Sequence, residues 1–179
     1  MKRMNKIFAA ILSVTLLFGA TMSANAAEAS VLLTVEQSDI NTAVTVPGQI
    51  PIIFNADGTN TYPTNWKISN TGEYTGVYLD YIKAEENSSG WELLGESEDL
   101  TKLSHDTQAF KFYMGKPENL KIFKPLADGG GSISFAENER ISIPAGSSQL
   151  FGFKMERGVF NTARAEHIAL KITLNFAYN

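Results

Sequence analysis

The chain has 179 residues, of which 15 are basic and 19 acidic, and its formal charge is −4. This acidic balance argues against nucleic acid as a partner, because phosphate backbones are bound by basic surfaces. The absence of cysteine excludes disulfides, thiolate metal sites and a cysteine nucleophile. We therefore expect a domain that is held together by its apolar core.

The first 26 residues have the pattern of a secretory signal peptide. Three basic residues within the first six positions precede an uncharged apolar run from Ile7 to Ala20, and Ala24-Asn25-Ala26 follows as a cleavage site. The run is shorter than the about 20 apolar residues of a membrane-spanning helix, so a retained anchor is the weaker alternative. The sequence predicts cleavage after Ala26 and a secreted single domain over 27–179, without a transmembrane segment. Any attachment to the cell surface would then be noncovalent.

Alternating apolar and polar residues predict β-strands along most of the mature chain. The pattern begins at Val31–Glu36 and is clearest over 168–177, where large apolar residues occupy every even position. Shorter alternating sets lie between them, in chain order at Val77, Leu79 and Tyr81; Ile133 and Phe135; Ile141 and Ile143; and Phe151, Phe153 and Met155.

Turn-forming residues separate these segments at intervals typical of all-β domains. They are Pro47-Gly48, Asp57-Gly58, Asn70-Thr71-Gly72, Ser88-Ser89-Gly90, 128–131 and Pro144-Ala145-Gly146. No window predicts a long amphipathic helix. The predicted fold is all-β: a two-sheet antiparallel β-sandwich, Ig-like or jelly-roll-like, with about eight or nine strands.

The first predicted strand is a candidate for assembly between copies of the chain. Cleavage after Ala26 would place Val31, Leu33 and Val35 close to a free terminus, where chain ends move unless a sheet holds them. The strand either pairs within its own domain or adds to the open edge of a neighbouring copy. In the second case, head-to-tail pairing would produce filaments.

Two glycine-containing loops resemble ligand motifs but have simpler interpretations. Residues Asn55 to Asn60 look like half a calcium-binding loop, yet they lack the remaining ligands and the closing Glu. We interpret Asp57-Gly58 as a tight turn, with a weak calcium site as the open alternative. Gly129-Gly130-Gly131 is followed by neither Lys-Ser/Thr nor a helix, which argues against a phosphate-binding loop and indicates a hairpin connection. The sequence predicts no metal and no cofactor.

Aromatic residues are concentrated in the first half of the mature chain. Alternation places Trp66 and Tyr81 on the core side of their predicted strands. This leaves Tyr62, Tyr74 and Tyr78 as candidates for an exposed row of rings that could stack on sugar faces. A glycan-binding surface is therefore one hypothesis for this chain.

No set of residues predicts an active site. Ser104-His105-Asp106 contains the residue types of a catalytic triad, but neighbours on an extended chain point to opposite faces, whereas triad members converge from separate parts of a fold. The carboxylates around Glu85 and Glu96 lie in polar surroundings, rather than facing each other across a cleft as glycosidase carboxylates do. We expect a protein that is not an enzyme.

Three stretches of the chain resemble small exported β-sandwich proteins of Gram-positive bacteria. They are Val44-Thr45-Val46-Pro47 leading to Ile50-Pro51-Ile52, then Asn55-Ala56-Asp57-Gly58-Thr59, and finally Lys67-Ile68-Ser69-Asn70 with Gly90-Trp91-Glu92-Leu93. The chain looks like the TasA and camelysin group, a resemblance that implies biofilm fibres formed by strand exchange. It also looks like WxL-domain proteins, which implies noncovalent attachment to the cell wall.

The resemblance to WxL-domain proteins rests on Trp91-Glu92-Leu93. The second motif expected in the closing strand is absent, because Leu174-Asn175-Phe176 contains no Trp. We expect a secreted, non-enzymatic structural or adhesive protein of the bacterial surface or biofilm matrix, with itself as a partner through strand exchange. The alternative is a β-sandwich module that binds cell-wall polymer or another glycan.

Overall fold

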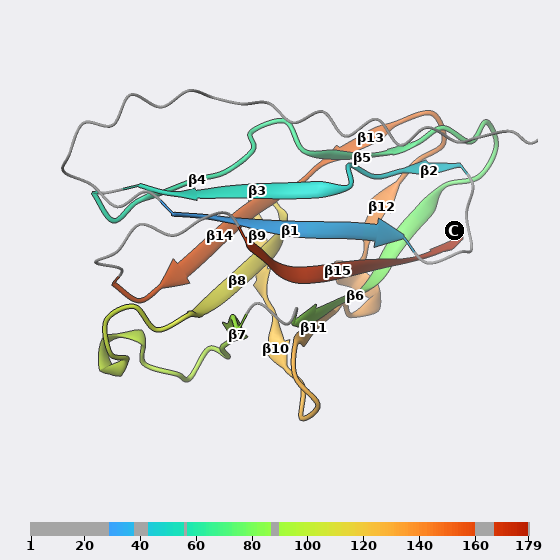
Figure 1. Cartoon of the computed structure of the whole chain (residues 1–179). Helices are drawn as coiled ribbons and strands as arrows, with labels where there is room; N and C mark the ends of the chain where they lie inside the picture. The colour runs from blue at the N-terminus through green and yellow to red at the C-terminus, as the bar shows by residue number, and fades with distance from the viewer. Residues whose placement is uncertain (1–28, 38–42, 56, 87–89, 160–166, 179) are drawn as a thin grey trace, which may run out of the picture.

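The computed structural model describes residues 29–37, 43–55, 57–86, 90–159 and 167–178 (Figure 1). Within these residues the chain forms fifteen β-strands, two short 3₁₀ helices and no α-helix, so the predicted all-β class is confirmed. The helices are η1 (Leu100–Lys102) and η2 (Glu137–Glu139). No helix in the described ranges has the length and apolarity needed to span a membrane.

The largest sheet has the strand order β10-β11-β6-β15-β1-β3-β4, with β12 also paired to β6. Its strands are β1 (Ala29–Gln37), β3 (Gln49–Phe54), β4 (Asn60–Thr61), β6 (Val77–Glu86), β10 (Lys124–Pro125), β11 (Gly131–Ser134), β12 (Ile141–Ile143) and β15 (His167–Tyr178). In Figure 1, β3, β1 and β15 run side by side across the molecule.

Two smaller sheets have the orders β13-β5-β2 and β14-β8-β7, and β9 also pairs with β8. Their strands are β2 (Val44–Thr45), β5 (Lys67–Asn70), β7 (Glu92–Leu93), β8 (Ala109–Lys116), β9 (Asn119–Ile122), β13 (Ser148–Leu150) and β14 (Gly152–Arg157). One segment links these two sheets, because β13 runs into β14 with only Phe151 between them. The Phe151 N–H donates to the Trp66 carbonyl at 3.0 Å, a normal length for a backbone hydrogen bond.

The prediction of purely antiparallel sheets is wrong for two strand pairs. β1 lies parallel to β15, and β7 lies parallel to β8. A tight turn joins only antiparallel neighbours, but β1 and β15 stand at opposite ends of the described chain and need no turn between them. The described residues also form more strands than the eight or nine predicted. Six of the fifteen have only two or three residues, which is short for an alternation pattern to reveal.

Buried apolar side chains from all three sheets form one cluster. Trp66 contacts Phe151 and Phe153 edge-on, with ring centroids 5.6 and 5.4 Å apart. Phe112 stacks on Phe153, an offset arrangement that adds to the area buried. The prediction that Trp66 points inward is confirmed. Ile172 on β15 is also fully buried, as its place in the alternating pattern predicts.

The prediction that Tyr81 points inward is wrong, because β6 contains a bulge. Leu79 lies opposite Phe176 and Tyr81 opposite Asn175, so Asp80 is an extra residue with no partner of its own in the β6–β15 register. An extra residue reverses the alternation beyond it. Tyr81 is therefore half-buried on the outer face.

The glycine run forms the predicted hairpin connection, between β10 and β11. Gly129 and Gly130 have φ values of 92° and 70°, which L side chains rarely adopt. A Cβ at Gly130 would also lie 2.2 Å from the carbonyl oxygen of Ala84. The run is therefore explained by a turn that approaches the backbone of β6 closely.

Candidate functional site

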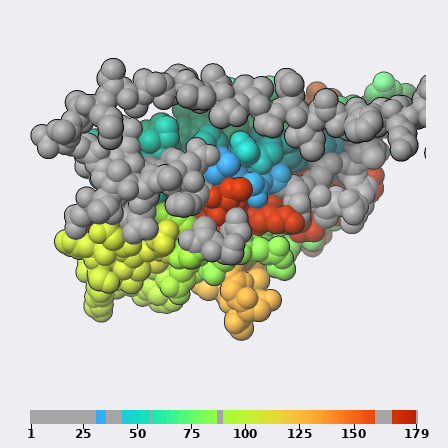
Figure 2. Space-filling view, viewed as in Figure 1, coloured from blue at the N-terminus to red at the C-terminus, as the bar shows by residue number. Residues whose placement is uncertain are grey.

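The candidate assembly strand, β1, lies in the interior of the largest sheet. It pairs in parallel with β15 on one side and antiparallel with β3 on the other. In the space-filling view, the blue surface of β1 lies between the cyan of β3 and the red of β15 (Figure 2). Its predicted core residues, Val31, Leu33 and Val35, are all buried in the main cluster.

Removing β1 would leave a slot one strand wide between β3 and β15. Two ladder spacings of about 4.8 Å separate those strands, so they cannot pair with each other without β1. The buried faces of the slot are lined by Ile50 and Ile52 of β3 and by Leu170 and Ile172 of β15. A strand with apolar residues at alternate positions is the shape that fills it.

The register of β1 on β3 identifies a pair of neighbouring outward side chains. The Val35 N–H donates to the Gly48 carbonyl at 2.9 Å, which makes this a hydrogen-bonded position of the ladder. Hydrogen-bonded and non-hydrogen-bonded pairs alternate along an antiparallel ladder. Leu32 and Pro51 therefore form a non-hydrogen-bonded pair, which suits Pro51 because it has no N–H. Thr34 and Gln49, two residues further along, form a non-hydrogen-bonded pair as well. Side chains at such positions approach each other most closely.

The binding of β1 depends on its hydrogen-bond ladders as well as on its apolar side chains. Burying three aliphatic side chains contributes about 1.5–3 kcal/mol each. Fixing the backbone of a nine-residue strand opposes this by about 1–2 kcal/mol per residue. Burial alone therefore does not hold β1, and pairing on both sides supplies the rest. A contact beyond the ladders is the Thr34 hydroxyl, which donates to the Leu170 carbonyl at 3.5 Å.

One exposed ion pair lies on the outer face of the sheet near the slot. Lys83 on β6 contacts Glu85 at 2.8 Å, and Lys171 on β15 lies opposite Glu85 in the register. The hydrogen bond from Lys83, followed by the charges of Lys83 and Lys171, lowers the pKa of Glu85 below its ordinary value. Exposed pairs of this kind contribute little to stability, so the slot is held by apolar and backbone interactions.

The structure separates the three tyrosines that were candidates for a sugar-binding row. Tyr62 follows β4 and Tyr78 lies on β6, four strand steps away in the same sheet, or roughly 19 Å at the usual spacing. The Tyr78 ring lies under the guanidinium of Arg140 at 4.6 Å. Tyr74, in the loop before β6, is 91% exposed. These rings do not form one row.

β3 and β4 pair antiparallel on either side of the Asn55 to Asn60 stretch, and the described residues of that stretch make turn contacts, such as the Gly58 N–H donating to the Asn55 carbonyl at 3.1 Å. The carboxylate of Asp57 accepts hydrogen bonds from the hydroxyl of Thr59 at 2.6 Å and from its N–H at 2.9 Å. These two bonds lower the pKa of Asp57. The guanidinium of Arg157 donates to the Asn55 carbonyl at 3.4 Å, which brings a positive charge to this loop. Both contacts favour the interpretation as a turn.

The residues that resembled a catalytic triad lie in a loop between η1 and β8. The Ser104 hydroxyl contacts Thr107 at 3.2 Å, and the Asp106 N–H donates to the Val159 carbonyl at 2.9 Å. Asp106 has a φ of 64°, a left-handed conformation that Asp tolerates better than most residues. His105 lines a cavity of about 160 Å³ together with Arg157. Among the described residues, no group of three or more His, Asp or Glu could hold a metal ion.

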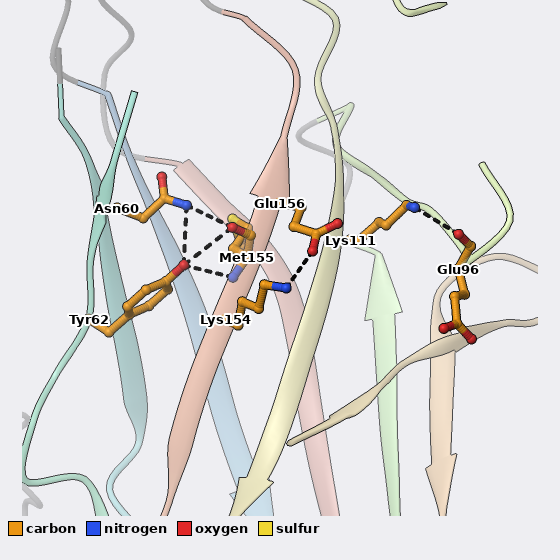
Figure 3. A network of polar contacts seen from close by, with 7 residues as sticks. All are labelled: Asn60, Tyr62, Glu96, Lys111, Lys154, Met155 and Glu156. Carbon is orange, nitrogen blue, oxygen red and sulfur yellow. Dashed lines mark hydrogen bonds and ion pairs between the residues drawn. The ribbon is translucent and has the colours of Figure 1, made fainter. Parts of the chain in front are cut away.

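Sequence reasoning missed a polar network along β14, which is shown in Figure 3. The Tyr62 hydroxyl accepts from the Met155 N–H at 2.7 Å and donates to the Met155 carbonyl at 3.3 Å. Asn60 donates to the same carbonyl at 2.8 Å. Tyr62 and Asn60 are 93 and 95 positions away from Met155 in the chain, so no local pattern connects them.

Figure 3 also shows a buried lysine on the neighbouring strand β8. Lys111 donates to the carbonyl oxygen of Glu96 at 2.8 Å, which ties the loop after β7 to the sheet. Beside it on β14, Lys154 contacts Glu156 at 2.6 Å. The Lys154 hydrogen bond is the main reason why the pKa of Glu156 lies below its ordinary value.

Comparison with protein-family models, with curated proteins and with solved structures finds no match to the chain.

Proposed function

We propose that the chain is a secreted, non-enzymatic structural protein of the bacterial surface or extracellular matrix, whose copies assemble by exchanging β1. The observation that carries this proposal is the place of β1 between β3 and β15. A second copy of the chain carries the same β1, so it can supply every backbone and side-chain contact that this slot requires.

Exchange of β1 would join copies head to tail. The donor strand of one copy fills the slot of the next, whose own β1 is then available to a third. Such a contact does not close on itself, so it extends into filaments. The proposal also includes the finer architecture, in which the largest sheet packs as one layer of a sandwich against the two smaller sheets linked through β13 and β14.

An engineered disulfide between positions 34 and 49 tests the proposal, because the native chain has no cysteine. The side chains of Thr34 and Gln49 lie opposite each other on the outer face of β1 and β3. We would express Thr34→Cys and Gln49→Cys as two separate variants of the mature chain, mix them at assembly concentration and oxidise them. Exchange predicts disulfide-linked heterodimers, because the new thiol on β1 of one copy then lies beside the new thiol on β3 of another.

The control is the double variant Thr34→Cys/Gln49→Cys, oxidised while dilute so that β1 is locked in its own sheet. It should stay monomeric in light scattering and electron microscopy, and it should assemble after reduction. A mixture of Thr173→Cys with Gln49→Cys gives the background level of heterodimers. Strand exchange is wrong if the mixture of Thr34→Cys with Gln49→Cys does not exceed this level and if the oxidised and reduced forms of the double variant behave alike.

The glycan-binding alternative has one specific observation in its favour, the exposed ring of Tyr74. Exposed aromatic rings are typical of surfaces that stack on sugars. Pull-down on purified peptidoglycan and on wall polymer, with Tyr74→Ala as the variant, tests it. Binding that is lost in Tyr74→Ala, together with a monomeric wild-type chain, would favour this alternative over assembly.

A further inference from the structure

The backbone of β14 has a second edge that two side chains cover. Among the strands of the described residues, β14 pairs with β8 alone, on one side. Met155 lies opposite Phe112 in that register, and the Phe112 carbonyl accepts from Phe123 on the side away from β14. This makes Met155 and Phe112 a pair without mutual hydrogen bonds, so the N–H and carbonyl of Met155 point away from β8 as well.

At this position the Tyr62 hydroxyl takes the place of a neighbouring strand. A strand partner would offer Met155 one acceptor and one donor, and the phenol offers both from a single oxygen atom. Asn60 adds a second donor to the Met155 carbonyl, and its side-chain oxygen accepts from Arg157 Nε at 3.0 Å. Side chains from one short segment therefore occupy the outward backbone groups of Met155 and hold the side chain of Arg157, two residues further along β14.

Contacts of other kinds lie at the two ends of this edge. Towards the start of β14, the Phe151 N–H donates to the Trp66 carbonyl at 3.0 Å. Towards its end, Arg157 lies over the ring of Phe54 at 4.6 Å and donates to the Asn55 carbonyl. The segment that follows β3 thus runs along β14, and Tyr62 is the contact at its centre.

We propose that Tyr62, supported by Asn60, closes the β14 edge against strands from a second copy of the chain, and so restricts pairing between copies to the β1 slot. An open edge strand with unpaired N–H and carbonyl groups is a template for strand addition. Side chains that form hydrogen bonds with those N–H and carbonyl groups remove the template without adding a strand. The inference about β14 holds whether or not β1 is exchanged, and only its consequence for assembly rests on the proposed function.

The test uses the oxidised Thr34→Cys/Gln49→Cys chain, in which β1 cannot be exchanged. Adding Tyr62→Phe and Asn60→Ala removes every side-chain hydrogen bond to Met155 that Figure 3 shows. The expected result is concentration-dependent association of the locked chain, seen by light scattering, with thioflavin binding. The amide of Met155 should exchange with deuterium about ten times faster or more, because its acceptor is gone.

Tyr74→Phe in the same locked chain is the matched control, because it removes an identical hydroxyl from a ring that is almost fully exposed. It should change neither association nor exchange at Met155. If the Tyr62→Phe/Asn60→Ala chain is folded by circular dichroism and stays monomeric, the inference is wrong. If the Tyr62→Phe/Asn60→Ala chain is unfolded, Tyr62→Phe alone is tested by light scattering and by deuterium exchange at Met155. Association no greater than that of Tyr74→Phe then overturns the inference. Failure of the heterodimer test on β1 would leave these outcomes unaffected.

Discussion

The β1 slot and the β14 edge are two solutions to the same problem of unpaired backbone groups. In the slot, a whole strand supplies two ladders and three buried side chains. On β14, a phenol and an amide supply the hydrogen bonds from within the chain segment 60–62. Under the proposed function, the strand in the slot is replaced by an identical strand from another copy. The two side chains follow closely on β3 in the same chain, so they fix the β14 edge, whereas the slot holds the strand that we propose to be exchanged.

Replacing Leu33 by Ala should cause the largest loss in the free energy of unfolding, because it weakens the packing of β1 at its centre. Leu33 is fully buried between Ile50 and Leu170, and truncation of a buried Leu costs about 2–5 kcal/mol through lost burial and the cavity left behind. A denaturant titration measures this loss in the free energy of unfolding. Thr34→Ala, on the outer face of the same strand, should change it by less than about 1 kcal/mol, and a loss equal to that of Leu33→Ala would contradict the register of β1.

Ile172→Ala tests the wall of the slot instead of the strand within it. Ile172 lies beside Val35 and is fully buried, while Thr173 next to it is half-buried on the outer face. We expect a loss of about 2–5 kcal/mol for Ile172→Ala. Thr173→Ala should stay within roughly 0.5 kcal/mol. Equal losses in denaturant unfolding would show that the alternation along β15 has been assigned to the wrong faces.

Tyr62→Phe should have a smaller effect on stability, even though it opens the edge. The substitution keeps the ring and removes one hydroxyl, which leaves the Met155 N–H without its acceptor. An unsatisfied buried group costs about 1–3 kcal/mol, and this position is only partly buried, so we expect the lower end of that range. Thermal unfolding measures it. A loss as large as that of Leu33→Ala would mean that Tyr62 supports the core as well as the edge.

Glu156→Gln should have the smallest effect, confined to acid. The Lys154 hydrogen bond lowers the pKa of Glu156 in the folded chain, so its stabilisation is present above the pKa of the unfolded chain and is lost as the pH falls through the folded value. The pair is partly exposed, which limits it to about 1 kcal/mol or less. Unfolding titrations at neutral and acid pH should show a shallower loss in the variant than in the wild type. An identical slope below pH about 4.5 would contradict the ion pair.

The features of the fold that the sequence predicted well are those that depend on local patterns. Alternation identified β15 and the burial of Ile172, and the glycine run indicated the hairpin between β10 and β11. Tyr81 was assigned to the wrong face because one extra residue, Asp80, reverses the alternation, and a bulge has no clear signature in a single sequence. The roles of β1 in assembly and of Tyr74 in glycan binding remain predictions.

Contacts between distant segments could not be predicted, because propensity and periodicity act over a few residues. The parallel partner of β1 lies at the other end of the described chain. The contact between Tyr62 and Met155 requires the segment around β4 to lie beside β14, which follows from the whole topology. A tyrosine a few residues after a predicted turn gives no sign that its hydroxyl replaces a strand.

The pairing of β1 with β15 also bears on how the protein folds. Thr34 and Leu170 are 136 positions apart, and contacts of such long range form slowly, because the intervening chain must be ordered or closed first. The interior of the largest sheet is therefore expected to be completed late. Until then β15 and the side of β1 away from β3 present open edges, so a neighbouring chain competes for the pairing between these two strands. If copies exchange β1 as proposed, the partition between monomer and filament would be set by protein concentration during this interval, rather than by the final stability of either form.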